Sequence, residues 1–179
     1  PTQLYMLDQM ALNAELESNM TSKRIKENNH TALTVSKKFN ATRLVLGLDA
    51  FEDHGHHVVG RYKKNNKEAK LATWIFQTFV DSESESITLR EIKKRGIKNK
   101  ERAFAKSSLH NYLTNLKLIS QAERNKQNKG RDEKFLMPYE RYELVELPHE
   151  PVIDLALWEK AQKIIAKNSE FLRKNTRLR

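Results

Sequence analysis

The sequence predicts a mainly α-helical protein with a small β component. Apolar residues recur every three or four positions through most of the chain, which is typical of helices that bury one face. Short alternating segments, typical of strands, occur only around residues 56–62 and 121–147. No apolar run approaches the roughly 20 residues that a membrane-spanning helix needs. We therefore expect a long N-terminal helix, a helical domain, a β-hairpin extension and a C-terminal helix.

The first expected element is a long helix from Leu4 to about Asn28. One apolar stripe comprises Leu4, Leu7, Ala11 and Ala14. Further apolar residues make this surface wider than a solitary helix keeps exposed: Met6, Met10, Leu12, Leu16 and Met20. Such a helix needs a partner, which is a missing domain, a second copy or the rest of this chain. Residues 31–49 are ambiguous, and their core candidates are Val35, Phe39, Leu44, Val45, Leu46 and Leu48.

The middle of the chain predicts a short strand followed by a helix. Residues 56–62 alternate loosely and precede a turn at Asn65 and Asn66. We expect Asn66 to cap a helix that runs to about Asp81. The buried face of this helix comprises Ala69, Ala72, Ile75, Phe76, Phe79 and Val80.

Residues 86–118 predict two short helices joined by a basic connector. Thr88 and Glu91 have the spacing of a capping box for the first helix, which ends at Gly96. We expect Ser107 to cap the second helix. The apolar stripe of that helix comprises Leu109, Tyr112, Leu113 and Leu116. A helix-turn-helix is the leading hypothesis for this domain, and a helical hairpin with a solvated polar face is the alternative.

The opposite face of the second helix is polar, and its residue types suit base recognition. Hydroxyls, amides and imidazoles read base edges in the major groove of DNA, and Asn suits adenine. The predicted base contacts are Ser107, Ser108, His110, Asn111 and Asn115. The predicted phosphate contacts are Lys98, Lys100, Arg102, Lys106 and Lys117. His110 has an alternative role as a histidine at the edge of the core.

The charge of the chain also favours a nucleic-acid partner. Its 33 Lys and Arg residues against 23 Asp and Glu residues give a net charge of +10. The excess is concentrated at residues 90–106, 124–134 and 167–179, as in proteins that bind phosphates. A solubilising surface is the alternative, and a membrane surface is a weaker one. The absence of cysteine excludes disulfides, thiolate zinc sites and a cysteine nucleophile, and is compatible with the cytoplasm.

The C-terminal third predicts a β-hairpin and a last helix. Residues 121–134 are polar and basic, as expected of an exposed loop between two short strands, and residues 139–147 supply the second strand. Asp154 is expected to cap the last helix. The inner stripe of that helix comprises Leu157, Trp158, Ala161, Ile164 and Ile165.

The order of several short segments resembles the serine recombinase family. These segments are Ala14–Glu17, Thr21–Ile25, Gly47, Asn66–Ala69 leading into Trp74–Phe76, Ser107–Asn115, Pro148–Asp154 and Trp158–Gln162. The resemblance is to the recombinase domain that follows the catalytic domain in large serine integrases and transposases. It covers nearly the whole chain. Residues 36–43 depart from the glycine-rich, proline-containing segment usual in the family, and the zinc-ribbon cysteines are absent.

The resemblance implies three consecutive domains. Residues 1–29 would be the long connecting helix, residues 30–120 the helix-turn-helix DNA-binding domain, and residues 121–179 the hairpin extension and the C-terminal helix leading to a missing domain. Residues 106–116 would be the recognition helix. The partners implied are double-stranded DNA and further copies of the full-length protein, from dimer to tetramer on DNA.

The resulting functional prediction is sequence-specific binding of double-stranded DNA as the recognition part of a site-specific serine recombinase, in DNA integration or excision. The chain has no room for the serine nucleophile domain, so we expect it to be inactive alone, without cofactor or metal. The alternative is a stand-alone helix-turn-helix transcriptional regulator. A third hypothesis is a metal enzyme that uses the cluster Asp53, His54, His56 and His57.

Overall fold

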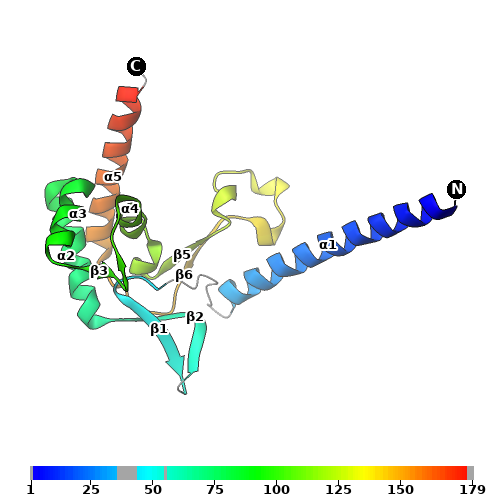
Figure 1. Ribbon diagram of the computed structural model, residues 1–179, viewed down its shortest axis with the longest axis horizontal. Helices are drawn as coiled ribbons and strands as arrows, with labels where there is room; N and C mark the ends of the chain where they lie inside the picture. The colour runs from blue at the N-terminus through cyan, green and yellow to red at the C-terminus, as the bar shows by residue number, and fades with distance from the viewer. Residues whose placement is uncertain (1, 36–43, 55, 177–179) are drawn as a thin grey trace. The chain divides into compact units, whose positions relative to one another are not determined.

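The computed structural model describes residues 2–35, 44–54 and 56–176 (Figure 1). The described residues form five α-helices, three pairs of short strands and several turns of 3-10 helix. This confirms the predicted mainly α-helical class with a small β component. No helix in the described ranges has the length and apolarity to cross a lipid bilayer.

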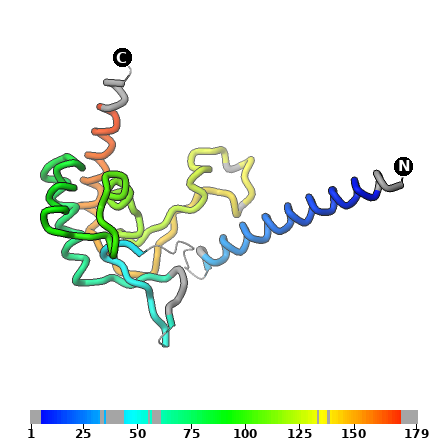
Figure 2. The backbone as a smooth tube through the Cα atoms, in the orientation of Figure 1, coloured from blue at the N-terminus to red at the C-terminus, as the bar shows by residue number. Residues whose placement is uncertain are grey.

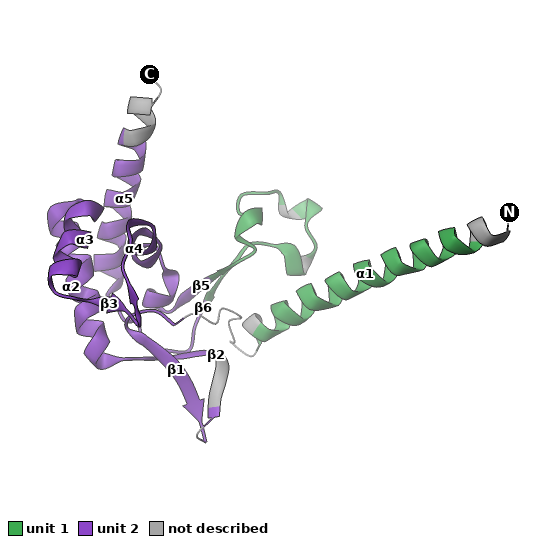
Figure 3. Ribbon diagram, in the orientation of Figure 1, with its two compact units in different colours: residues 1–40, 123–145 green, residues 41–122, 146–179 purple. Residues whose placement is uncertain are grey.

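The chain divides into two compact units, and each contains segments distant in sequence (Figure 3). Unit 1 comprises residues 1–40 and 123–145, and unit 2 comprises residues 41–122 and 146–179. The last part of the chain therefore packs with the helical domain. The three consecutive domains expected from the sequence stay a prediction.

Unit 1 contains the long helix α1, Thr2–Thr34, and the loop of the hairpin extension. The predicted long N-terminal helix is confirmed and extends six residues beyond Asn28. Its large apolar side chains are exposed: Met6, Leu7, Met10, Leu12, Leu16, Met20 and Ile25. Near its C-terminal end, Lys26 Nζ lies 3.3 Å from a carboxylate oxygen of Glu140, which ties α1 to the extension.

Helix α2, Asn66–Ser82, forms the centre of unit 2. Its N-cap is Asn65, whose side-chain oxygen accepts hydrogen bonds from the backbone N–H groups of Lys67 and Glu68, both at 3.1 Å. The prediction that Asn66 is the cap was wrong by one residue. The predicted buried face is confirmed for Ala69, Ala72, Ile75, Phe76 and Phe79.

Helix α3, Glu85–Lys94, begins before the predicted capping box. Ser84 is its N-cap, and the Thr88 hydroxyl donates a 2.8 Å hydrogen bond to the Ser84 carbonyl from a fully buried position. Glu91 instead pairs with Lys94 at 2.7 Å. The prediction that Thr88 and Glu91 start the helix was wrong because burial commits Thr88 to the interior of the helix.

The basic connector contains a hairpin that the sequence analysis did not predict. Strand β3, Lys98–Asn99, pairs antiparallel with β4, Arg102–Ala103, and the chain then enters α4, Lys106–Leu113 (Figure 2). The N-cap of α4 is Ala105, so the prediction of Ser107 was wrong. Ser108 completes the cap, because its hydroxyl accepts from the Ala105 N–H at 2.7 Å and donates to the Ala105 carbonyl at 2.9 Å.

Helix α4 is anchored by the apolar stripe that its spacing predicts. Leu109, Tyr112 and Leu113 are buried. The Tyr112 ring packs against Phe104, with ring centroids 5.4 Å apart, and against Phe76 of α2 at 6.1 Å. One edge of α4 is thereby fixed in the core, which leaves the other edge free to face solvent.

The remaining strands and the last helix complete the architecture. Strand β1, Leu48–Asp53, pairs antiparallel with β2, His56–Lys64, and β5, Gln121–Arg124, pairs with β6, Glu143–Glu146. The second pair confirms the predicted hairpin extension. Helix α5, Leu155–Thr176, begins after Asp154, whose carboxylate accepts from the Ala156 N–H at 3.2 Å as predicted. Gln162 of α5 donates a 2.8 Å hydrogen bond to the Leu113 carbonyl, closing the end of α4.

Candidate nucleic-acid interface

The polar face of α4 lies opposite its buried stripe. Ser107, His110 and Asn111 are exposed, and Ser108 and Asn115 are half-buried. Ser107 and Asn111 are four residues apart and therefore share one face of the helix. A helix that buries one edge and presents short hydroxyl and amide groups on the other has the geometry needed to enter a major groove.

Three of the five predicted base contacts also have structural partners. Ser108 caps α4, and Nδ1 of His110 lies 2.7 Å from a carboxylate oxygen of Glu85 at the start of α3. The Asn115 side chain accepts a 3.1 Å hydrogen bond from the Lys117 N–H, which starts a turn of 3-10 helix, Leu116–Ile119. The His110 contact fixes α4 against α3, while the Ser108 and Asn115 contacts stabilise the start of α4 and the turn after it. Ser107 and Asn111 are exposed and project outward from α4.

The predicted phosphate contacts separate into two groups. Lys98, Arg102 and Lys106 are exposed along the connector and at the first residue of α4. Lys100 and Lys117 are held inside unit 2 by partners of their own. The exposed group lies beside the polar face of α4 in sequence.

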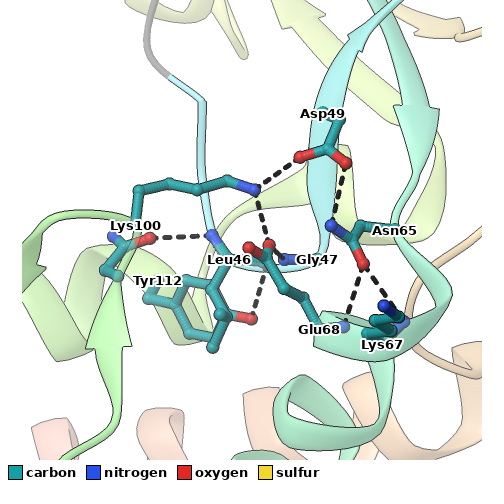
Figure 4. Close-up of polar contacts among 9 residues, drawn as sticks. Leu46, Gly47, Asp49, Asn65, Lys67, Glu68, Lys100 and Tyr112 are labelled. Atoms are coloured by element: carbon teal, nitrogen blue, oxygen red, sulfur yellow. Dashed lines mark hydrogen bonds and ion pairs between the residues drawn. The ribbon is translucent and has the colours of Figure 1, made fainter.

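Lys100 is the centre of an ion-pair cluster (Figure 4). Its Nζ lies 2.7 Å from Oδ1 of Asp49 in β1 and 2.5 Å from Oε2 of Glu68 in α2. Burial opposes the charge on Lys100, but hydrogen bonds to both carboxylates outweigh burial and raise its pKa. Burial likewise opposes the charge on Asp49, and the hydrogen bond from Lys100 reverses that effect and lowers the Asp49 pKa.

Glu68 of this cluster and two neighbouring side chains also form hydrogen bonds with the backbone at Leu46 and Gly47 (Figure 4). Oε2 of Glu68 accepts from the Gly47 N–H at 2.8 Å, and the Asn99 side chain accepts from the Leu46 N–H at 2.7 Å. The Tyr112 hydroxyl donates to the Leu46 carbonyl at 2.9 Å. The connector, α2 and α4 are therefore joined through one short segment of backbone.

Gly47 is required at this point for two reasons. Its φ of +98° lies in a region that side chains rarely adopt, and a Cβ there would lie 2.6 Å from Cγ1 of Val152. In the sequence, Gly47 is notable only as part of the family resemblance. The ion-pair cluster and its bonds to the backbone were not predicted, because no sequence spacing relates Asp49, Glu68 and Lys100.

Lys117 is buried against an aromatic ring. Its Nζ donates a 3.1 Å hydrogen bond to the Tyr62 hydroxyl and lies 4.8 Å from the centre of that ring. Burial lowers the Lys117 pKa to about 8. This environment indicates a structural role for Lys117. The phosphate contact stays a prediction.

The histidine cluster does not assemble a metal site among the described residues. No group of three or more His, Asp and Glu side chains suited to a metal occurs in that part of the chain. The His54 side chain is almost fully exposed, and its Nε2 lies 3.7 Å from Oδ1 of Asp53. The side chain of His57 lies outside the described residues.

Comparison with known proteins identifies the family. A model of the Recombinase family matches residues 66–168. A crystal structure of an LSR–DNA complex is similar over 72% of this chain and 33% of that chain, with 20% identity and a TM-score of 0.51. A structure from work on the sequence requirements of the Listeria innocua prophage attP site is similar over 83% of this chain and 51% of that chain, with 19% identity and a TM-score of 0.52.

The present chain thus spans about a third of one solved chain and about half of the other. No curated protein matches it. The family match includes α2, α3, the connector, α4 and most of α5, and it covers more than half of the 179 residues. The chain therefore belongs to the Recombinase family, as its resemblance to the recombinase domain of large serine recombinases predicted.

Proposed function

We propose that this chain is the part of a site-specific serine recombinase that recognises double-stranded DNA, and that α4 lies in the major groove. The observation that carries the proposal is the outward position of Ser107 and Asn111, one turn apart on the face opposite the buried stripe of α4. In this proposal Asn111 contacts an adenine edge and Ser107 a neighbouring base.

The exposed cations supply the sequence-independent part of the binding energy. Lys98, Arg102 and Lys106 contact phosphates and set the register of α4 on the duplex. Lys100 and Lys117 act indirectly, because the first holds the connector and the second is buried against Tyr62. His110 positions α4 against α3, and Ser108 and Asn115 stabilise the two ends of α4; all three lie at the margin of the contact.

Membership of the Recombinase family supports this function over a stand-alone transcriptional regulator. One of the two similar solved structures is an LSR–DNA complex, and the other comes from work on a prophage attP site. In our proposal the full-length protein performs DNA integration or excision as an assembly of two to four copies. This chain contributes the recognition of the site.

The test is the replacement Asn111→Ala. We expect it to weaken binding to a duplex selected from a random pool by the wild-type chain, by about 1–3 kcal/mol, because one bidentate contact is lost. Binding to unselected duplexes should change little. Fluorescence anisotropy at fixed salt measures both affinities.

Gln77→Ala is a matched control, because Gln77 is also an exposed amide but lies on α2. It should leave both affinities unchanged. Equal losses on selected and unselected DNA with Asn111→Ala would contradict base reading by α4.

A further inference from the structure

The loop of the hairpin extension, residues 125–142, is built on a defined framework. The Asn125 side chain donates to the carbonyls of Tyr139 and Arg141, at 2.8 and 2.9 Å. The buried Asn128 side chain donates to the Glu140 carbonyl at 2.7 Å, and the Arg124 guanidinium contacts the Tyr139 carbonyl. Side-chain amides thus replace the missing strand pairing and hold the two halves of the loop together.

This framework presents an aromatic ring to solvent. Phe135 is 86% exposed, the highest value among the large apolar side chains of the described residues, and Met137 beside it is 50% exposed. Phe135 ends a turn of 3-10 helix, Glu133–Phe135, in which its N–H donates to the Asp132 carbonyl at 3.2 Å. Leaving such a ring in water forgoes the free energy that its burial would gain, so a partner that covers it would be favoured.

The charges beside the ring indicate the chemistry of that partner. Arg131 and Lys134 are exposed on either side of Asp132, whose carboxylate accepts from the Lys134 N–H at 3.0 Å. Lys126 and Lys129 both pair with the single carboxylate of Glu123, at 3.4 and 3.2 Å, which offsets one of their two positive charges. An exposed aromatic ring next to cations fits a polyanion with stacked rings better than it fits a protein surface.

We propose that Phe135 is a wedge that inserts between two adjacent base pairs from the minor groove, while Arg131 and Lys134 contact the flanking phosphates. Apolar side chains presented this way unstack a base step and kink the duplex. The proposal rests on the proposed DNA-binding function but concerns a second contact, in unit 1 and separate from α4. It also gives a role to Arg131 and Lys134 within the basic cluster at residues 124–134.

The experiment compares Phe135→Ala with Phe135→Leu and with the control Phe171→Ala, since Phe171 is a second exposed phenylalanine on α5. The probe is the duplex selected from a random pool by the wild-type chain, with 2-aminopurine placed at each step in turn. We expect the wild type to raise 2-aminopurine fluorescence at one step. Phe135→Ala should abolish that signal and weaken binding roughly tenfold, which is the size expected for one stacking contact.

Phe135→Leu should keep most of the signal, because leucine also acts as a wedge, and Phe171→Ala should behave as the wild type. A wild type that binds without unstacking any step overturns the wedge, and so does Phe135→Ala if the fluorescence signal persists. Loss of self-association in sedimentation equilibrium, with DNA unstacking unchanged, would identify Phe135 as a protein contact and also overturn it. Failure of the wild type to bind any duplex overturns the proposed function together with the wedge.

Discussion

Lys117 is buried, although lysine side chains are usually exposed. Only 9% of the residue is exposed, its amine is hydrogen-bonded to Tyr62, and its pKa falls to about 8. The cationic side chain of Lys117 predicted a phosphate contact. The aromatic ring that covers it comes from β2, 55 residues away, and no local pattern reveals such a partner.

The buried amine makes a prediction about stability against pH. Below about pH 8, Lys117 is protonated in both the folded and the unfolded chain, and the cost of burying the charge is fully present. Above pH 8 the folded chain releases this proton, whereas the unfolded chain keeps it to about pH 10.5, so the free energy of unfolding rises with pH. We expect a gain of about 1–2 kcal/mol between pH 7.5 and 9.5.

Urea unfolding across this range, below the pH at which tyrosines ionise, measures the gain. Lys117→Met should remove most of the rise, since methionine has similar length and no charge. Lys163→Met on the exposed face of α5 is the control and should keep it. A rise of equal size in Lys117→Met would show that another group causes it.

At the scale of elements, the connector depends on the Lys100 cluster. Its strands have two residues each, and two backbone pairings alone give such a hairpin little stability. The bonds from Lys100 to Asp49 and Glu68 attach it to β1 and α2 instead. The cluster thereby holds Lys98 and Arg102, the exposed cations of this hairpin, beside α4.

Lys100→Met should therefore destabilise the chain by about 1–3 kcal/mol, because two half-buried carboxylates lose their common partner. The urea midpoint measures this loss, provided that the slope of the transition is unchanged. Lys98→Met, at an exposed position of the same hairpin, should change the stability by less than about 0.5 kcal/mol. Equal midpoints for the two variants would show that the cluster contributes nothing measurable.

The N-termini of the helices show how precisely local sequence patterns locate a helix boundary. Local patterns predict α2, α3 and α4 but misplace the N-cap of each helix. They indicate Asn66, Thr88 and Ser107, whereas the caps are Asn65, Ser84 and Ala105. Neighbouring Ser, Thr and Asn residues are all acceptable caps, so the choice falls to packing. At α3, for example, Thr88 lies inside the helix and its hydroxyl donates to the Ser84 carbonyl, so Ser84 is the cap instead.

At the scale of the whole molecule, charge is the feature that should govern DNA affinity. Replacing Lys98 and Arg102 with Gln lowers the net charge from +10 to +8, and we expect the dependence of log affinity on log salt to flatten by about two units. The control replaces Lys160 and Lys163 of α5 with Gln, which changes the net charge equally. It should leave the slope near the wild-type value.

Titration of unselected duplexes at several salt concentrations measures these slopes. The comparison separates phosphate contacts from the general effect of net charge, because only contacted cations release counterions from the duplex. The same change of slope in both double variants would argue that the connector makes no special contact with DNA.

The sequence by itself determined the helical class, the hairpin extension, the apolar stripe of α4 and the membership of the family. Each of these depends on residues close together in the chain, whose periodicity or composition is visible in the sequence, or on the order of segments. Only the tertiary structure decided which polar residues are available for binding. Ser107 and Asn111 project from α4, while Lys100 and Lys117 are held inside unit 2 by residues of α2, β1 and β2. The physical reason is that burial and ion pairing join segments far apart in sequence, and the residue types at one position do not encode the partner at the other.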